Sequence, residues 1–316
     1  MDEHDASRCT AHDEPELHVV TGAFGYVGRY IARRLLADNQ RVRTLTAHPN
    51  RPNPFRGQVA VYPLCFDDIG DLAISMLGAV TLYNTYWVRF EAGRVTFDTA
   101  VRNSSFLITA ARWAGVRRIV HISITNPSIH SSLPYFRGKA EVESIVAASG
   151  VSHAIIRPTV VFGSDGILIN NIAWLMRRFP IFAVPGSGDY RVQPVFAEDL
   201  AELAVDAGQR QDTLTIDAVG PEIYTFTELV RLIADAVKSR ARIVRVPRGV
   251  ALFTARVLGL LVRDVILTRD EAEGLMSSLL VSEGPPTART SFKRWLGEHA
   301  DSLGVRYLSE LERHYR

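Results

Sequence analysis

Short apolar runs alternate with segments of helical periodicity along the first half of the chain. The runs are short and rich in β-branched residues, as strands are, and they lie at residues 17–20, 41–46, 59–64, 80–84, 118–123 and 153–163. Between them, apolar side chains recur at helical spacing, for example at Val27, Tyr30, Ile31 and Leu35. Strands that alternate with helices predict an α/β fold with a doubly wound parallel sheet.

The second half has a different pattern. Residues 167–178 have helical periodicity, whereas residues 180–188 begin with Pro180 and end with Gly188 and predict a loop. A strand is predicted at residues 243–246. Two capping boxes on either side of that strand predict the starts of two helices, Thr225-x-x-Glu228 and Thr268-x-x-Glu271.

The most apolar stretch of the chain, residues 249–267, does not predict a membrane-spanning helix. Arg256 and Arg263 interrupt it, and because they are seven residues apart they fall on one face of a helix. The rest of the circumference is broadly apolar. A wide apolar face indicates a core or a subunit interface, and the alternatives are a channel for an apolar substrate and a contact with a membrane surface.

A glycine-containing segment, residues 21–28, joins the first predicted strand to the first predicted helix. In such a turn Gly22 permits the tight bend, Gly25 lets a pyrophosphate approach the backbone, and Gly28 lets the helix lie close to the sheet. The free amides at the start of the helix then face the anion. The alternative is an ordinary structural turn. We predict a dinucleotide site that contains Gly22, Phe24, Gly25, Tyr26, Val27 and Gly28.

Tyr135 and Lys139 are four residues apart at the start of a segment with helical sequence. Side chains at this spacing are neighbours on a helix, with about 5–6 Å between Cβ atoms, so Lys139 can place its ammonium near the phenol. A positive charge there stabilises phenolate and lowers the pKa of Tyr135. The phenol can then exchange a proton with a hydroxyl or carbonyl while hydride moves to or from a nicotinamide. The pair predicts an acid–base site; the alternative is a surface Tyr and Lys.

These two motifs, in this order, resemble the extended and atypical branch of the short-chain dehydrogenase/reductase family, over residues 19–200. The chain looks like NAD(P)-binding epimerase and dehydratase relatives, and it is also similar to the accessory nucleotide-binding subunit of respiratory complex I. The resemblance implies a dinucleotide-binding Rossmann domain at residues 17–163, to which residues 192–220 return. Residues 164–191 and 221–316 would form a smaller C-terminal substrate lobe, and residues 1–16 are expected to be a disordered acidic tail.

The resemblance also implies roles for residues at the strand ends. Ser123 and Thr125 follow a predicted strand, where a hydroxyl bonds the reacting oxygen in the family. Both are expected in the pocket, and the choice between them stays open. Lys139 would also hold the nicotinamide ribose. The other expected cofactor contacts are Asp67 at the adenine, Asp68, which could equally cap a helix, Asn84 beside the ribose and phosphates, and Pro158, Thr159 and Val160 near the nicotinamide amide.

The end of the second predicted strand bears on the choice of cofactor. An acidic residue there binds the ribose 2′-hydroxyl of NAD, whereas a basic residue accommodates the 2′-phosphate of NADP. No acidic residue lies between Arg41 and Gln58, and His48 and Arg51 follow the strand. The alternative is that these bases simply keep a loop soluble. We predict NADP in preference to NAD, with His48 and Arg51 in contact with it.

Composition agrees with this architecture and narrows the partners. A chain of 316 residues with 47% hydrophobic content can bury one large core and a smaller lobe. Its 36 basic residues are balanced by 34 acidic ones, so no nucleic-acid partner is predicted. Cys9 and Cys65 have neither metal-ligand nor disulfide spacing, and no metal is expected. With an acidic start unlike a targeting peptide, the chain is predicted to be cytoplasmic; a homodimer is left open.

The motifs together predict an NAD(P)-dependent oxidoreductase, or an epimerase- or dehydratase-like enzyme, in which Tyr135 and Lys139 form the acid–base pair. The expected substrate is a small alcohol, ketone or sugar nucleotide. The alternative is a non-catalytic NAD(P)-binding protein that acts in assembly or redox sensing. The presence of both Tyr135 and Lys139 favours the enzyme, because a pure binder has no need of the phenol.

Overall fold

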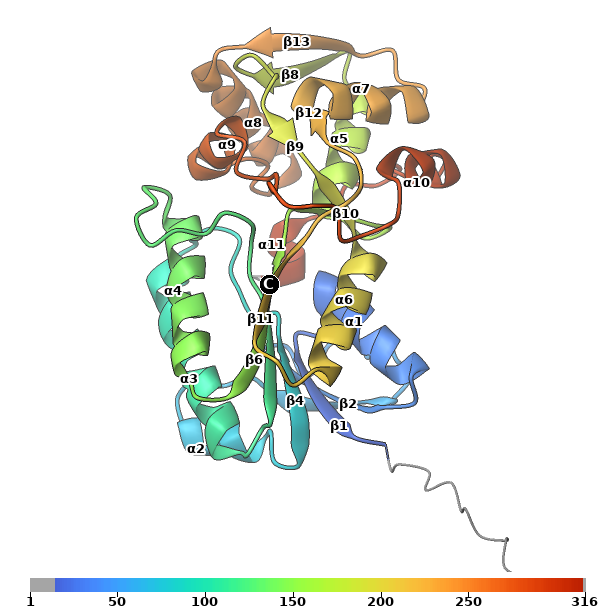
Figure 1. Ribbon diagram of the computed structural model, residues 1–316. Helices are drawn as coiled ribbons and strands as arrows, with labels where there is room; N and C mark the ends of the chain where they lie inside the picture. The colour runs from blue at the N-terminus through green and yellow to red at the C-terminus, as the bar shows by residue number, and fades with distance from the viewer. Residues whose placement is uncertain (1–14, 315–316) are drawn as a thin grey trace, which may run out of the picture.

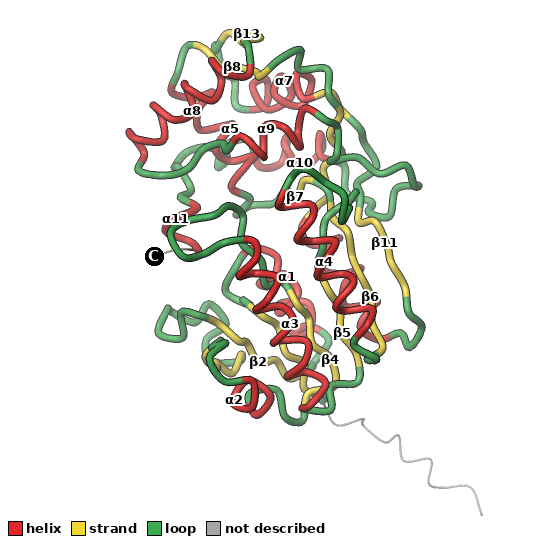
Figure 2. The backbone as a smooth tube through the Cα atoms, turned by 90° about the vertical axis from the view of Figure 1, so that its left-hand side faces the viewer, coloured by secondary structure: helices red, strands yellow, loops and turns green. Residues whose placement is uncertain are grey.

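The computed structural model describes residues 15–314, which form a lower and an upper lobe (Figure 1). Residues 1–14, and with them Cys9 and most of the predicted acidic tail, lie outside the described part. The lower lobe is built on a sheet of seven strands, and Figure 2 shows both lobes turned by 90°. In chain order these strands are β1 (Leu17–Thr21), β2 (Arg41–Thr46), β3 (Val59–Pro63), β4 (Ala79–Asn84), β5 (Arg118–Ile122), β6 (Ser152–Pro158) and β11 (Leu214–Ala218).

The sheet has the strand order β11-β6-β5-β4-β1-β2-β3, and every neighbouring pair is parallel. The chain therefore builds outward from β1 in one direction and then from β4 in the other. This confirms the predicted doubly wound parallel sheet. The direction reverses between β1 and β4, which is the place where ligands bind in sheets of this kind, beyond the carboxyl ends of the strands.

Helices cover both faces of this sheet, and two apolar cores lie between them and the strands. One face is covered by α1 (Tyr26–Ala37) and α6 (Ala197–Gln209), which pack together, and the other by α2 (Ile69–Ile74), α3 (Phe97–Trp113) and α4 (Pro134–Ala148) (Figure 1). Val19, Val20, Leu82 and Val120 on the central strands are fully buried. Strands buried on both faces read as continuous apolar runs, which is why the pattern of the sequence identified them.

The upper lobe is made of short strand pairs and helices. Its elements are β7 (Val160–Phe162), α5 (Ile167–Arg178), β8 (Ile181–Pro185), β9 (Arg191–Val192), β10 (Pro194–Phe196), β12 (Tyr224–Thr225), α7 (Phe226–Ala236), β13 (Arg242–Val246), α8 (Arg248–Val262), α9 (Arg269–Met276) and α10 (Phe292–His299). Both predicted capping boxes are confirmed, because Thr225 caps α7 and Thr268 caps α9, each with the reciprocal bond from its glutamate.

The predicted loop at residues 180–188 is wrong. Ile181–Pro185 forms β8, which pairs in parallel with β13. The partner strand lies about sixty residues further along the chain, so the ladder that holds β8 extended has no local signature. Pro180 and Gly186, which suggest a loop when read locally, flank the strand instead.

The C-terminal helix α11 (Glu310–His314) lies between the two lobes (Figures 1 and 2). Asp264, which follows α8, accepts hydrogen bonds from the backbone amides of Glu310 and Leu311 at 2.8 and 3.1 Å and from the Tyr307 hydroxyl at 2.9 Å. A buried carboxylate of the upper lobe therefore fixes the start of α11. Among residues 15–314, every helix is too short or too polar to span a bilayer.

Among the glycines of the turn, we expect substitution of Gly28 to destabilise the fold most. A Cβ atom at Gly28 would overlap the carbonyl oxygen of Gly22 and lie 2.9 Å from its carbonyl carbon. Backbone atoms must move to make room, so Gly28→Ala should lower the free energy of unfolding by on the order of 1–3 kcal/mol. Urea unfolding followed by circular dichroism measures this.

Gly297→Ala is the matched control. Gly297 is exposed in the interior of α10, and a Cβ atom there would meet no heavy atom within 4 Å. Since alanine is the better helix former, this variant should be neutral or more stable by about 0.5–1 kcal/mol. Equal stabilities of the two variants would contradict the proposed contact of Gly28 with the turn.

Candidate functional site

The turn between β1 and α1 has the backbone geometry of an anion site. Gly22 has φ +65°, which favours glycine, and its amide donates to the Leu45 carbonyl at 2.8 Å. The Gly25 amide donates to the Gly22 carbonyl at 2.8 Å, and α1 begins immediately after Gly25. No side chain among the described residues caps α1, and its first turn contains no acidic residue. The N-terminal amides and the positive end of the helix dipole are therefore available to a phosphate.

The other predicted residues of the turn differ in what their side chains contact. The ring of Phe24 packs near that of Phe55, with 6.3 Å between centroids, and Val27 is partly buried in the core beneath α1. The hydroxyl of Tyr26 is buried and has no partner among the described residues. It lies so close to Gly163 and Gly166 that a Cβ atom at either would come within 3.1 Å. The segment after β7 thus lies directly against the start of α1.

Of the two basic residues predicted at the cofactor after β2, Arg51 contacts the C-terminal segment. Arg51 donates to the backbone carbonyls of Arg313 at 2.6 Å and Glu312 at 3.2 Å, and the amide of His48 donates to the Thr46 hydroxyl at 3.1 Å. Arg313 in turn donates to the Asp165 carbonyl at 2.8 Å, and its guanidinium lies 5.9 Å from the centre of the Tyr26 ring. Sequence reasoning missed this position of Arg313, because no local pattern connects the C-terminal helix with the glycine turn.

Three polar side chains predicted at the cofactor take part in local structure. Asp68 is the N-cap of α2 and accepts from the amides of Gly70 and Asp71 at 2.6 and 3.2 Å, the alternative that its sequence position left open. Asp67 accepts from the thiol of Cys65 at 3.2 Å. Asn84 is fully buried at the end of β4, where its oxygen accepts from the Tyr86 amide at 3.1 Å.

Tyr135 and Lys139 lie together at the start of α4, around the indole of Trp87. The Tyr135 ring meets Trp87 and Phe97 edge to face, with centroids 5.9 and 5.8 Å apart. The Lys139 ammonium lies 4.8 Å from the centre of the Trp87 ring and donates to the Ile122 carbonyl at 2.9 Å. Trp87 can approach α4 this closely because residue 138 is glycine; a Cβ atom there would lie 2.9 Å from the indole. The motif residues therefore share one aromatic environment at the end of β5.

Burial lowers the pKa of Lys139 from the usual 10.5 to about 7. The side chain is only 3% exposed, so its charged form loses most of its hydration, and the nearby Glu143 carboxylate opposes the shift only in part. Glu143 is itself paired with Arg157 through two hydrogen bonds of 2.9 and 2.5 Å. Lys139 therefore changes charge near neutral pH, which is a property of acid–base sites.

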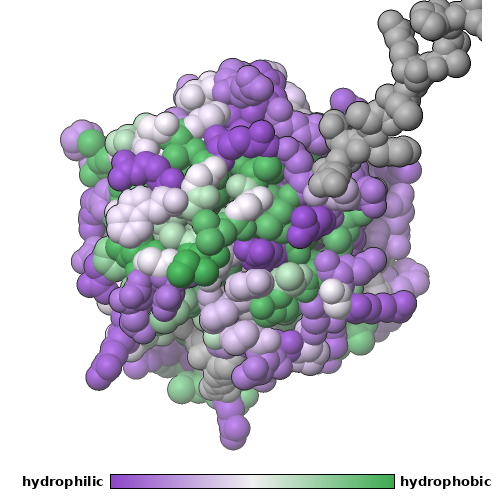
Figure 3. Space-filling model, turned by 90° about the horizontal axis from the view of Figure 1, so that it is seen from below, coloured by the Kyte–Doolittle hydropathy of each residue, from purple (hydrophilic) through white to green (hydrophobic). Residues whose placement is uncertain are grey.

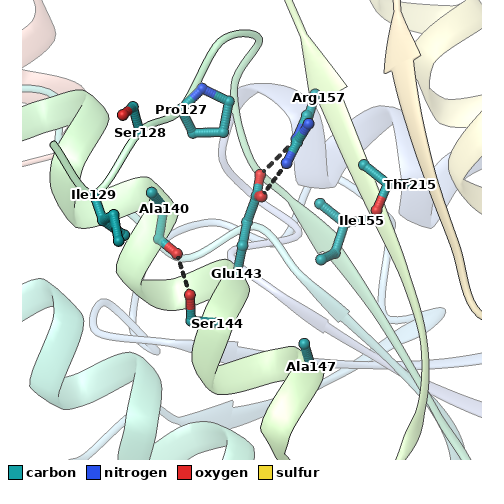
Figure 4. A pocket seen from close by; sticks show the side chains of 10 residues that line it. All are labelled: Pro127, Ser128, Ile129, Ala140, Glu143, Ser144, Ala147, Ile155, Arg157 and Thr215. Atoms are coloured by element: carbon teal, nitrogen blue, oxygen red, sulfur yellow. Dashed lines mark hydrogen bonds and ion pairs between the residues drawn. The ribbon is translucent and has the colours of Figure 1, made fainter. Parts of the chain in front are cut away.

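Figure 4 shows this Glu143–Arg157 pair in a groove of about 420 Å³ beside α4 and β6. All ten residues that line the groove are drawn, and they include neither Tyr135 nor Lys139 nor a glycine of the turn. The groove is thus separate from the predicted site. Its ion pair matters because it holds Glu143 one helical turn from Lys139.

Ser123 and Thr125 differ in what holds their hydroxyl groups. The Ser123 hydroxyl is buried and has no hydrogen-bond partner among residues 15–314. The Thr125 hydroxyl donates to the Leu279 carbonyl of the upper lobe at 3.2 Å, and the neighbouring Asn126 donates to the carbonyls of Leu279 and Val281 at 2.9 and 2.8 Å. Burial of a hydroxyl without a hydrogen-bond partner is energetically unfavourable, and a ligand that bonds the hydroxyl removes this cost. Ser123 is therefore the better placed of the two to meet a bound oxygen.

Pro158 ends β6, and the segment that follows it enters the upper lobe. Its carbonyl accepts from the Thr125 amide at 3.0 Å, and the hydroxyl of Thr159 donates to the Gln193 carbonyl. Val160 begins β7 and is buried in the core of the upper lobe. These three residues lie beside the strand end that bears Ser123, because β6 is the neighbour of β5 in the sheet.

Comparison with known proteins agrees with this geometry. Residues 18–219 match the sequence model of the NAD dependent epimerase/dehydratase family. The chain is 24% identical over 292 residues to the mitochondrial NADH dehydrogenase [ubiquinone] 1 alpha subcomplex subunit 9 of Arabidopsis thaliana, covering 84% of this chain and 70% of that protein. It is 28% identical over 249 residues to the ceramide reductase of Caulobacter vibrioides, covering 75% of each.

Solved structures show the same fold. The NADPH-dependent quinone oxidoreductase QOR2 of Escherichia coli, complexed with NADPH, superimposes with a TM-score of 0.72 at 19% identity, covering 90% of this chain and 99% of that one. Because this match covers 90% of the chain, it extends over both lobes. The resemblance inferred from the two sequence motifs is confirmed.

The low pKa of Lys139 predicts that this residue destabilises the fold in a pH-dependent way. The folded protein binds this proton less tightly than the unfolded chain does, so wild-type stability should rise with pH between about 7 and 10. Lys139→Met removes the buried charge. Below pH 7 the variant should be more stable by on the order of 3 kcal/mol, and the difference should shrink towards pH 10.

Urea unfolding at a series of pH values measures this difference. Lys293→Met in the exposed part of α10 is the control, and it should follow the wild-type pH dependence. If Lys139→Met retained the same pH dependence as wild type, Lys139 would not be the group that titrates.

Proposed function

Because the chain belongs to the NAD-dependent epimerase/dehydratase family, we propose that it binds NADP or NAD at the glycine turn and catalyses hydride transfer to or from a small substrate. Tyr135 and Lys139 form its acid–base pair. The observation that carries the proposal is the position of Lys139, which is buried beside the indole of Trp87 and whose ammonium bonds the Ile122 carbonyl next to Ser123. The reacting oxygen would come from an alcohol, a ketone or a sugar nucleotide.

The residues around the turn fit a dinucleotide. Gly22, Gly25 and Gly28 leave the backbone uncovered at the start of α1, and a Cβ atom at Gly25 would approach the Gly22 carbonyl to 3.0 Å. The pyrophosphate would accept hydrogen bonds from amides that no described side chain caps. The site also lies where the strand order reverses, between β1 and β4.

The reacting end of the site fits a polar ligand in an apolar environment. The Ser123 hydroxyl and the indole nitrogen of Trp87 are both buried, and neither has a partner among the described residues. The rings of Trp87, Phe97 and Tyr135 pack against one another beside them. An incoming substrate oxygen would satisfy the serine hydroxyl, and polar interactions are stronger in such an environment than in water.

When bound, the nicotinamide supplies or accepts the hydride. Tyr135 exchanges the accompanying proton with the substrate oxygen, while Ser123 donates a hydrogen bond to that oxygen. The ammonium form of Lys139 favours the phenolate form of Tyr135 through its positive charge. Since the pKa of Lys139 is about 7, this assistance is strongest at and below neutral pH.

NADP is the proposed cofactor in preference to NAD. The loop after β2 offers His48 and Arg51 to a 2′-phosphate and, in the sequence, no carboxylate between residues 41 and 58 to a 2′-hydroxyl. Arg51 bonds two carbonyls of the C-terminal segment. A phosphate would be a stronger acceptor for the guanidinium than these neutral carbonyls, so it would compete with them for Arg51.

A non-catalytic nucleotide-binding protein is the second candidate. Two observations favour it. The Thr125 hydroxyl is engaged with the upper lobe rather than free for a substrate, and the Tyr135 ring is packed against three other aromatic rings. One of the relatives is a subunit of a respiratory NADH dehydrogenase. In that role the chain would bind the dinucleotide as a structural or sensing component.

Replacement of Gly25 tests the cofactor site. Gly25→Val should abolish binding of NADPH while the protein remains folded, because the side chain covers the backbone that the pyrophosphate approaches. Isothermal titration with NADPH and NADH measures the affinity, and circular dichroism checks the fold. Arg51→Gln is the companion variant. It should lower the affinity for NADPH and leave the affinity for NADH nearly unchanged. Equal affinity of wild type and Gly25→Val for NADPH would rule out the site.

Replacement of Tyr135 tests the chemistry. Tyr135→Phe should keep the affinity for the cofactor and reduce turnover by a factor on the order of 10² to 10⁴, the usual contribution of a positioned acid or base. Turnover is followed by nicotinamide absorbance, after a screen of alcohols, ketones and sugar nucleotides. Tyr62→Phe, on the edge strand β3, is the control and should be fully active. Full activity of Tyr135→Phe would exclude the mechanism, and tight binding without any turnover would favour the second candidate.

A further inference from the structure

Helix α8 buries only small residues fully and exposes five of its large apolar residues. Its buried side chains are Ala251 and Ala255, together with Gly259, whose backbone lies against the carbonyl of Asp264. A surface helix of a globular protein normally does the opposite and buries its large apolar residues. The inner face of α8 is therefore built for close packing on the upper lobe, and its outer face has another role.

The outward residues form one continuous stripe. Phe253 is 69% exposed, Leu260 75% and Leu261 73%, with Val250 and Val257 also exposed. At 100° per residue all five fall within about 100° of one another around the helix. Large apolar side chains gathered on one exposed face, unlike single ones scattered over a surface, mark a site of interaction.

The segment that contains α8 carries only positively charged side chains. Residues 236–263 contain seven basic residues and no acidic one. Arg245 pairs with Asp189, and Arg248 pairs with Glu273. The other five are exposed and form no ion pair with any residue from 15 to 314: Lys238, Arg240, Arg242, Arg256 and Arg263. This excess of positive charge is local, because the formal net charge of the protein is only +2.

This surface lies at the outer end of the upper lobe. Figures 1 and 2 place α8 and β13 at the end of the molecule remote from α2. The opposite end also exposes apolar side chains, among them Ile74 at the end of α2 and Leu77 after it, but there hydrophilic and hydrophobic residues are interspersed (Figure 3). Near Ile74 the charges are mixed: Asp67, Asp68 and Asp71 are close in the sequence, and the Arg43 guanidinium donates to the carbonyls of Ser75 and Leu77 at 2.7 and 3.3 Å. The apolar stripe of α8 is therefore accompanied by unpaired basic residues, whereas charges of both signs lie beside Ile74 and Leu77.

We propose that α8 docks the protein on an anionic phospholipid surface. Phe253, Val257, Leu260 and Leu261 enter the boundary between headgroups and acyl chains, and Arg256 and Arg263 contact the lipid phosphates from one side of the stripe. An amphipathic helix with a basic polar face binds membranes in this way, lying in the plane of the interface. Unpaired basic residues near the surface add electrostatic attraction to anionic lipids. The inference is independent of the nucleotide site, which lies in the lower lobe.

A vesicle binding assay with the full chain tests the proposal. Vesicles of phosphatidylcholine alone are compared with vesicles of three parts phosphatidylcholine to one part phosphatidylglycerol, and bound protein is separated by flotation. Wild-type protein should partition onto the anionic vesicles more strongly by on the order of tenfold or more, and added salt should weaken that binding.

Variants separate the apolar and the electrostatic contributions. Replacing Phe253, Leu260 and Leu261 together with serine should reduce partitioning by at least about tenfold. Arg256→Gln with Arg263→Gln should reduce it by about tenfold at low salt and less at high salt. Ile74→Ser with Leu77→Ser, which removes exposed apolar residues from the opposite end, is the matched control and should bind like wild type. All these residues are exposed, and thermal unfolding verifies that each variant is folded.

Three results would overturn the proposal. The first is wild-type protein that floats with neither kind of vesicle at low salt, and the second is a serine variant that binds anionic vesicles as well as wild type does. The third is a wild-type dimer by light scattering that becomes a monomer in the serine variant, without binding of either protein to vesicles. That result would assign the stripe to a second copy of the chain.

Discussion

The close approach of α1 to the turn after β1 is the constraint on which the rest of the structure depends. Gly28 sits against the Gly22 carbonyl with no room for a side chain, and Gly22 has a left-handed backbone. This contact directs the start of α1 towards the point where the strand order reverses. The segment Gly163–Gly166 then packs on Tyr26, also through glycines, so the upper lobe meets the lower one at the mouth of the site.

Polar contacts between the lobes complete the site. Thr125 and Asn126, just beyond β5, donate to carbonyls at 279–281, and Arg51 donates to carbonyls of α11. Asp264 fixes the other end of that helix segment from the upper lobe. Any relative movement of the lobes would therefore alter the surroundings of both the glycine turn and Tyr135. This coupling suits an enzyme that must exclude water and equally a binding protein that must report occupancy.

The pKa of Lys139 is set by the burial of its side chain rather than by the residue type alone. Burial beneath Trp87 lowers its pKa to about 7, and the Glu143–Arg157 pair limits how far Glu143 can oppose that shift. The same burial that makes the ammonium costly in the folded state makes it responsive near neutral pH. The indole of Trp87, which stacks on Phe97, comes from a different part of the chain than α4, and Gly138 makes its approach to α4 possible.

The sequence by itself determined the elements whose signals are local. Apolar runs identified the strands of a sheet buried on both faces, the capping boxes located the starts of α7 and α9, and glycine and Tyr-x-x-x-Lys spacings located the two motifs. Tertiary structure decided what depends on distant residues. It made residues 181–185 a strand by pairing them with 242–246, joined Arg51 to the C-terminal helix and left five large apolar side chains of α8 exposed. Local patterns specify backbone conformation, whereas burial, charge state and hydrogen-bond partners come from residues that only the folded chain brings together.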